Sequence, residues 1–208
     1  MSNFLKQSAQ KGFTLIELII VITILVILCV VVVVLIDPAE ILAQSRDSQR
    51  ISDLASIKGA SQLVLTSGTP STVDCGSTQP INSTSSMWIS LPSTTGGSAY
   101  ASTTAALSQL ADGTGWIRMN YASSTTGRAL SNLPTDPTNT LSGSLYYRWG
   151  CTNIGSIYEY EIDATLESAK YKASCTASSC DDKSARDGGN SATRYETGNN
   201  LNILPATL

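Results

Sequence analysis

Carboxylates and thiols are the reactive side chains of this 208-residue chain, because it contains no histidine. Without histidine, the Ser-His-Asp and Cys-His nucleophile pairs, His-ligated zinc and the usual general base near neutral pH are excluded. Glu159, Glu161 and Asp163 alternate with apolar residues, so on a strand they would share one face. We predict that this face is the solvent side of a half-buried sheet. Together with Asp136, these carboxylates would form the site of a membrane-tethered enzyme, one functional alternative.

Four cysteines lie outside the longest apolar run, and Cys29 lies within it. An even number of cysteines outside the apolar run predicts two disulfides in an oxidising compartment. Four thiolates on a metal ion, or free thiols, are the alternatives, although no C-x-x-C spacing is present for a metal site. The spacing allows three connectivities. Of these we favour a short Cys175–Cys180 bridge, which leaves Cys75–Cys151 as the longer one.

Residues 13–36 form the apolar run. As a helix it would be about 36 Å long, enough to cross a hydrocarbon core of roughly 30 Å. Lys6 and Lys11 precede it, so the positive-inside bias places the N-terminus in the cytoplasm and the chain beyond Ile36 outside. One carboxylate, Glu17, lies near the start of the run. A charge at the centre of a bilayer costs about 2.5–3.5 kcal/mol, so we expect Glu17 to have a function.

The stretch KGFTLIE, residues 11–17, resembles the class III signal of type IV pilins and type II secretion pseudopilins. The resemblance implies that a prepilin peptidase cuts between Gly12 and Phe13 on the cytoplasmic side and then N-methylates Phe13. It also implies that Glu17 takes part in docking an incoming subunit, by pairing with the amine of Phe13 in its own chain or in an adjoining subunit. The apolar segment would be a single-pass anchor in the cytoplasmic membrane. It would later form the core of an extracellular or periplasmic filament built from copies of the chain.

Asp37 and Pro38 follow the apolar run, and we predict a kink near Ile36 because proline removes a backbone donor. Residues 37–67 are predicted to continue as an amphipathic helix. Its apolar stripe consists of Leu54, Ile57, Ser61 and Val64. Its charged side chains are predicted to lie mainly on other faces; they are Arg46, Asp47, Arg50, Asp53 and Lys58.

Residues 68–208 are predicted to form an extracytoplasmic globular head after a leader (1–12), a membrane or filament-core helix (13–36) and the amphipathic helix (37–67). Within the head, residues 68–97 are predicted to be an exposed connection. A short helix is expected at 103–112 and a strand at 116–121.

Residues 144–150 and 156–166 have the alternating pattern of an antiparallel hairpin, with about 5–6 residues between the strands. A possible last strand lies in the polar tail. These patterns together predict an α+β fold in which the second half of a long N-terminal helix packs on an antiparallel β-sheet head.

Asp181, Asp182 and Asp187 lie close to two consecutive glycines and offer hard oxygen ligands. They lack the D-x-D-x-D-G spacing of an EF-hand, and a solvated polar turn is the alternative. Residues 133–200 resemble the C-terminal half of pseudopilins, which often carries a calcium loop. We therefore expect no cofactor, and calcium is the one candidate if a cofactor is bound.

The charge balance does not favour nucleic acid as a partner, because the chain has 13 basic and 16 acidic side chains. The resemblance implies a structural subunit of a type IV pilus-like filament, without a catalytic site. Its partners would be copies of itself, the prepilin peptidase, a pilus or secretion assembly platform and the membrane. A pseudopilin of a type II secretion system is the alternative, although the cysteines and the Ser- and Thr-rich head favour an exposed pilus.

Overall fold

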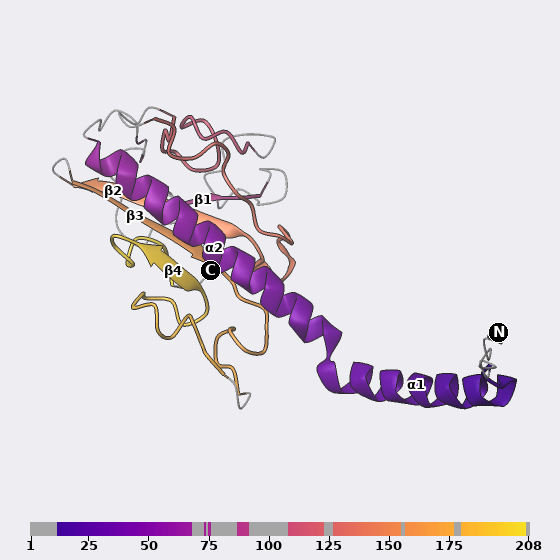
Figure 1. Cartoon of the computed structure of the whole chain (residues 1–208). Coiled ribbons are helices and arrows are strands. Elements are labelled where there is room, and N and C mark those ends of the chain that lie inside the picture. The colour runs from indigo at the N-terminus through magenta and orange to yellow at the C-terminus, as the bar shows by residue number, and fades with distance from the viewer. Residues whose placement is uncertain are drawn as a thin grey trace, which may run out of the picture. The chain divides into compact units, whose positions relative to one another are not determined.

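The computed structural model describes residues 12–67, 73, 75, 87–91, 108–122, 127–154, 157–176 and 180–206 of the chain. The chain divides into two compact units, Met1–Ile41 and Leu42–Leu208. The first unit contains helix α1 (Leu15–Ile36) and the start of helix α2 (Pro38–Thr66). The second contains the rest of α2 and a four-stranded antiparallel sheet, so the predicted α+β class is confirmed (Figure 1).

The helix is interrupted at Asp37. This residue has φ 42° and ψ 82°, a left-handed conformation that ends α1, and Pro38 begins α2. A short polar side chain tolerates this conformation better than a β-branched one. Asp37 Oδ1 then accepts a hydrogen bond from the backbone N–H of Glu40 (3.4 Å), as an N-cap does. The interruption therefore lies at the predicted Asp-Pro step.

Helix α2 contacts the head through one stripe. Leu54 and Ile57 are fully buried in this stripe, together with Val64, and pack against Trp149 and Ile162 of the sheet. This confirms the apolar stripe. The rest of the buried stripe consists of Ala43, Asp47, Arg50, Ala60 and Ser61.

Asp47 and Arg50 are fully buried on that stripe, so the prediction that they lie on other faces is wrong. Their burial is tolerated because each is paired. Arg50 Nε and Nη2 bind the two carboxylate oxygens of Asp136 (2.6 and 2.9 Å), and Nη1 binds Asp47 and Glu167 (both 2.8 Å). Asp47 in turn accepts from the backbone N–H of Ser168 (2.8 Å). These bonds connect α2 to two segments far away in the sequence, one at Asp136 and one at residues 167–168.

The sheet has the order β1-β2-β3-β4. Its strands are β1 (Met87–Ile89), β2 (Tyr147–Ile154), β3 (Ile157–Ala164) and β4 (Tyr195–Gly198). The predicted hairpin is present as β2 and β3. However, pairing continues to Ile154↔Ile157, so the strands are separated by two residues rather than five or six.

Both faces of the sheet are covered. Side chains such as Trp149 and Ile162 pack under α2, whereas Met87, Ile89 and Leu204 form a second cluster with Leu91 and Tyr146. Because the C-terminal segment around Leu204 covers this second face, Glu161 and Asp163 are fully buried there. The prediction that they form a solvent-facing surface is wrong.

Other parts of the head differ from the sequence prediction. Residues 108–112 are not helical, and 103–107 lie outside the described residues. The expected strand at 116–121 is reduced to two isolated bridges, Met119↔Val73 and Asn120↔Asp112. Strand β1 lies within the segment predicted to be an exposed connection. A short 3-10 helix, η3 (Ser142–Ser144), precedes β2, and β4 supplies the expected last strand.

Candidate functional site

The predicted cleavage point lies outside regular secondary structure. Gly12 and Phe13 precede α1, and the Phe13 side chain is 88% exposed. A Cβ atom placed on Gly12 would meet no other atom within 4 Å. The peptide bond between the two residues is therefore accessible within this unit. A larger side chain at position 12 would not disturb the fold of this chain. Any effect of such a side chain on cleavage would therefore come from its contact with the peptidase.

Thr14 caps the start of α1. Its backbone is extended (φ −81°, ψ 151°), and its Oγ1 accepts a hydrogen bond from the backbone N–H of Glu17 (3.3 Å). A carboxylate in the first turn is favourable, because the unpaired N–H groups there carry partial positive charge. The helix begins at Leu15, two residues after Phe13. Phe13 therefore lies just before α1, and the pairing of its amine with Glu17 stays a prediction.

Helix α1 exposes apolar side chains around its whole circumference, and none of its residues is buried. Its one hydroxyl group, Thr23 Oγ1, donates to the carbonyl of Ile19 (2.7 Å) and so needs no outside partner. The helix is long and apolar enough to cross a membrane. A helix that is hydrophobic on all sides is stable only in lipid or among other protein chains.

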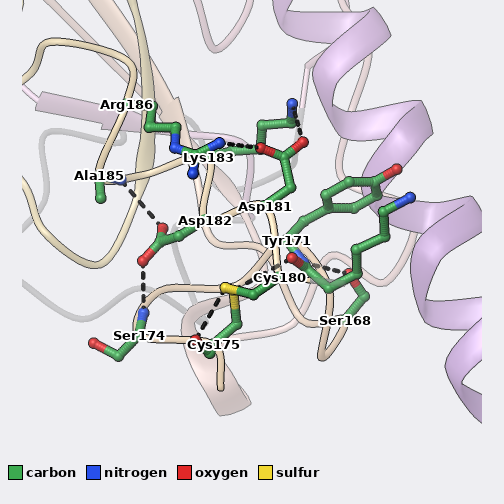
Figure 2. The surroundings of a disulfide bond; sticks show 11 residues. Ser168, Tyr171, Ser174, Cys175, Cys180, Asp181, Asp182, Lys183, Ala185 and Arg186 are labelled. Atoms are coloured by element: carbon green, nitrogen blue, oxygen red, sulfur yellow. Dashed lines mark hydrogen bonds and ion pairs between the residues drawn. A yellow bond between two sulfur atoms is a disulfide. The ribbon is translucent and has the colours of Figure 1, made fainter. Parts of the chain in front are cut away.

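The cysteines of the head form two disulfides. Cys75 and Cys151, whose Cα atoms are 5.3 Å apart, tie the region after α2 to strand β2. Cys175 and Cys180, with Cα atoms 5.7 Å apart, close a short loop (Figure 2). Cys29 on α1 has a free thiol. The bridges restrict the unfolded chain and so stabilise the head.

The three calcium candidates are bound by groups of the chain itself. Figure 2 shows Asp181 beside Lys183 Nζ (2.5 Å) and Arg186 Nη1 (3.0 Å). The hydrogen bond from Lys183 lowers the pKa of the Asp181 carboxyl. Asp182 accepts from two backbone N–H groups at 2.7 and 3.1 Å, and Asp187 from two others at 2.9 and 2.7 Å. Calcium binding at these residues stays a prediction.

A second carboxylate cluster lies within the covered face of the sheet, where Glu196, missed in the sequence, joins Glu161 and Asp163. Oxygen atoms of Glu161, Asp163 and Glu196 lie within 4.8 Å of one another. Glu161 Oε2 accepts from the backbone N–H groups of Ile203 (2.7 Å) and Leu204 (2.8 Å). Burial, with the adjacent Glu196, raises the pKa of the Glu161 carboxyl to about 9. Glu161 is therefore protonated at neutral pH, and the Glu161–Glu196 pair holds one proton.

Asp163 pairs with two buried arginines. Arg148 Nε donates to Asp163 at 2.8 Å, Arg148 Nη2 also binds this carboxylate, and Arg194 Nε donates at 2.6 Å. Among the described residues, Glu161, Asp163 and Glu196 form the one acidic group close enough to hold a cation, but the two guanidinium groups already neutralise Asp163. The side chains of a strand alternate between its two faces, so the sequence at 194–197 could have placed Glu196 on one face. The sequence does not show which segment covers that face.

The carboxylates of the enzyme alternative do not form a single site. Asp136 belongs to the Arg50 network, whereas Asp163 binds Arg148 and Arg194. Glu159 is half-buried and accepts from Asn200 Nδ2 (2.7 Å).

Comparison with known protein families gives a match near the start of the chain. Residues 7–33 match the prokaryotic N-terminal methylation motif, the class III signal of type IV pilins and pseudopilins, so the resemblance seen at residues 11–17 is confirmed. The motif implies processing by a prepilin peptidase and filament assembly in general, and with α1 it is consistent with membrane anchoring. Searches of curated proteins and of solved structures found no match.

Proposed function

We propose that this chain is the structural subunit of a type IV pilus-like filament, cut between Gly12 and Phe13, methylated on Phe13 and polymerised through α1. The observation that carries the proposal is that the methylation motif, residues 7–33, includes most of a helix in which no residue is buried. Before assembly, lipid covers this helix, with the N-terminus in the cytoplasm. After assembly, the α1 helices of neighbouring copies cover one another.

Glu17 gives the filament its axial register in this proposal. Cleavage converts the amide nitrogen of Phe13 into an amine, which stays cationic after methylation. A lone carboxylate is strongly disfavoured in an apolar bundle, whereas a paired one is tolerated. Because α1 begins only at Leu15, the amine of a neighbouring copy is the better partner for Glu17. A subunit one step out of register would leave both charges unpaired.

Substitution of Gly12 tests the processing step. We expect Gly12→Glu to leave a full-length, unassembled precursor in the membrane. The control is Gly59→Glu, since Gly59 is also exposed and a Cβ atom there would meet nothing within 4 Å. The control is expected to be cut and assembled normally. The mass of the mature chain, measured by mass spectrometry of sheared fibres, should correspond to a start at N-methylated Phe13. Fibres built from chains that still carry Met1 would refute the proposal.

The alternative is a pseudopilin, which would form a short periplasmic filament that drives secretion. The two disulfides in the head fit both alternatives, because the periplasm and the cell surface are both oxidising. Electron microscopy separates the two, since a pilus subunit is recovered in long sheared surface fibres. Absence of such fibres, combined with loss of exported enzymes when the gene is deleted, would favour the pseudopilin.

A further inference from the structure

A cavity of about 350 Å³ lies beside the buried arginines of the sheet. It is lined by Arg148 on β2, Thr165 just after β3, and Thr193 and Arg194 just before β4. This volume is at the small end of the range for ligand pockets, which is about 300–1,000 Å³. It would hold a molecule of about the size of one sugar residue.

The charged side chains that line the cavity are both arginines. Two guanidinium groups, Arg148 and Arg194, share the single carboxylate of Asp163. The arginines hold the pKa of the Asp163 carboxyl below its usual range, so this carboxylate stays ionised between the two guanidinium groups. The nearest other carboxylate pair, Glu161 and Glu196, does not line this cavity; Glu196 lines a different one.

The two arginines are held in place but retain unused donors. Arg194 binds the backbone carbonyls of Ser144 (3.2 Å) and Tyr146 (2.7 Å) and the hydroxyl of Thr165 (2.6 Å). Arg148 uses only its Nε and Nη2 groups, both on Asp163, and in the part of the chain that the structure describes its Nη1 has no partner. The free edge of a guanidinium group offers two parallel N–H donors, the geometry that suits a carboxylate.

We infer that this cavity is a binding site for the carboxylate group of a small molecule no larger than about one sugar residue. Nη1 and the outer N–H of Nη2 of Arg148 bind the carboxylate. The Thr165 and Thr193 hydroxyls bind polar groups on the rest of the molecule. The site is preorganised, because Arg148 lies on a strand and Arg194 is fixed by two backbone carbonyls, so binding requires little ordering of side chains.

Titration calorimetry of the full chain in non-ionic detergent tests the inference, with D-glucuronate as the probe and D-glucose as a neutral control of the same size. We expect glucuronate to bind one site and glucose to give no heat of binding. Raising the salt concentration from about 0.02 M to about 0.15 M shortens the Debye length to about 8 Å and should weaken binding only modestly, because the site is recessed.

Thr193→Glu places a carboxylate at the exposed rim of the cavity without removing either arginine. We expect it to weaken glucuronate binding about tenfold or more, because it repels the ligand or occupies Arg148 itself. Ser56→Glu adds the same charge at an exposed site on α2 and should bind like the wild type. Thr165→Val is a second variant, expected to weaken binding without adding charge. Absence of glucuronate binding, or equal affinity in Thr193→Glu and Ser56→Glu, would overturn the assignment.

Discussion

The buried Glu161–Glu196 pair predicts an unusual dependence of head stability on pH. Each carboxylate uses its Oε2 to accept backbone N–H groups, whereas both Oε1 atoms are buried and have no hydrogen-bond partner among the described residues. If both groups were ionised, two negative charges would lie close together without water. A proton shared between them removes this repulsion. The protonated form of Glu161 is therefore part of the stable fold.

The sign follows from proton counting. Glu161 has a pKa of about 9 in the folded head and an ordinary value of 4.5 when unfolded, so between these values the folded state holds one more proton. Stability is then complete below the unfolded pKa and falls as the pH rises towards 9. One proton corresponds to about 1.4 kcal/mol per pH unit, so the free energy of unfolding should fall by roughly 3 kcal/mol between about pH 6 and pH 8.

Neighbouring groups do not reverse this sign. Arg148 faces the pair from β2, and its pKa is raised, so it stays charged. Asp163 on β3 has a lowered pKa and is ionised throughout this range. Asp187, whose Oδ2 accepts from the backbone N–H of Glu196, has a pKa raised by burial, a shift of the same direction as that of Glu161.

Glu161→Gln tests the reasoning, because a glutamine mimics the protonated acid. Its carbonyl can accept from Ile203 and Leu204, and its amide can donate to Glu196. We expect the variant to be at least as stable as the wild type at pH 8 and to lose most of the slope between pH 6 and pH 8. Urea unfolding of the full chain in non-ionic detergent, followed by the fluorescence of the buried tryptophans, measures both quantities.

Glu159→Gln is the matched control, since Glu159 is on the same strand and face but is hydrogen-bonded to Asn200. It should keep the wild-type slope. A wild-type head whose stability is constant or rises from pH 6 to pH 8 would refute the shared-proton account, and so would an unchanged slope in Glu161→Gln.

Three further predictions concern the ion network, the assembly residue and the disulfides. Arg50→Met should cost about 3–5 kcal/mol in urea unfolding, because Asp47 and Asp136 become buried unpaired charges. Arg46→Met, at a side chain 37% exposed, should change the stability little, and similar losses in both variants would contradict the structure. Glu17→Leu should be cleaved and stay in the membrane but build no fibres. Thr23→Leu is the control and should assemble, because the hydroxyl that it removes is hydrogen-bonded within the same helix. If electron microscopy showed a normal number of Glu17→Leu fibres, the role of the carboxylate would be ruled out. Because the Cys75–Cys151 bridge spans a sequence separation of 76 and Cys175–Cys180 one of 5, removing the first by serine substitution should cost about 4.5 kcal/mol and removing the second about 2 kcal/mol. Alkylation of the denatured, non-reduced chain should label Cys29 alone, and labelling of any head cysteine would show that its bridge is absent.

The parts of this protein that the sequence alone determined are those governed by local patterns. The methylation motif is a contiguous string of residues, and the apolar run after it has one stable backbone conformation in lipid, a helix. The break at Asp37 follows from the conformational limits of proline. Leu54 and Ile57 were placed on the buried stripe of α2 by helical spacing, and the β2–β3 hairpin was indicated by alternation along two adjacent strands.

Only the tertiary structure decided the environment of the charged residues. Alternation shows that Glu161 and Asp163 share a face, but the pattern is the same whether water or another segment covers that face. The C-terminal segment covers it here, which turns a predicted polar surface into a buried network of carboxylates and arginines. Arg50 likewise became a core residue because Asp136, 86 positions away, meets it in space. A buried charge depends on a partner brought by the fold, and a local pattern contains no information about that partner.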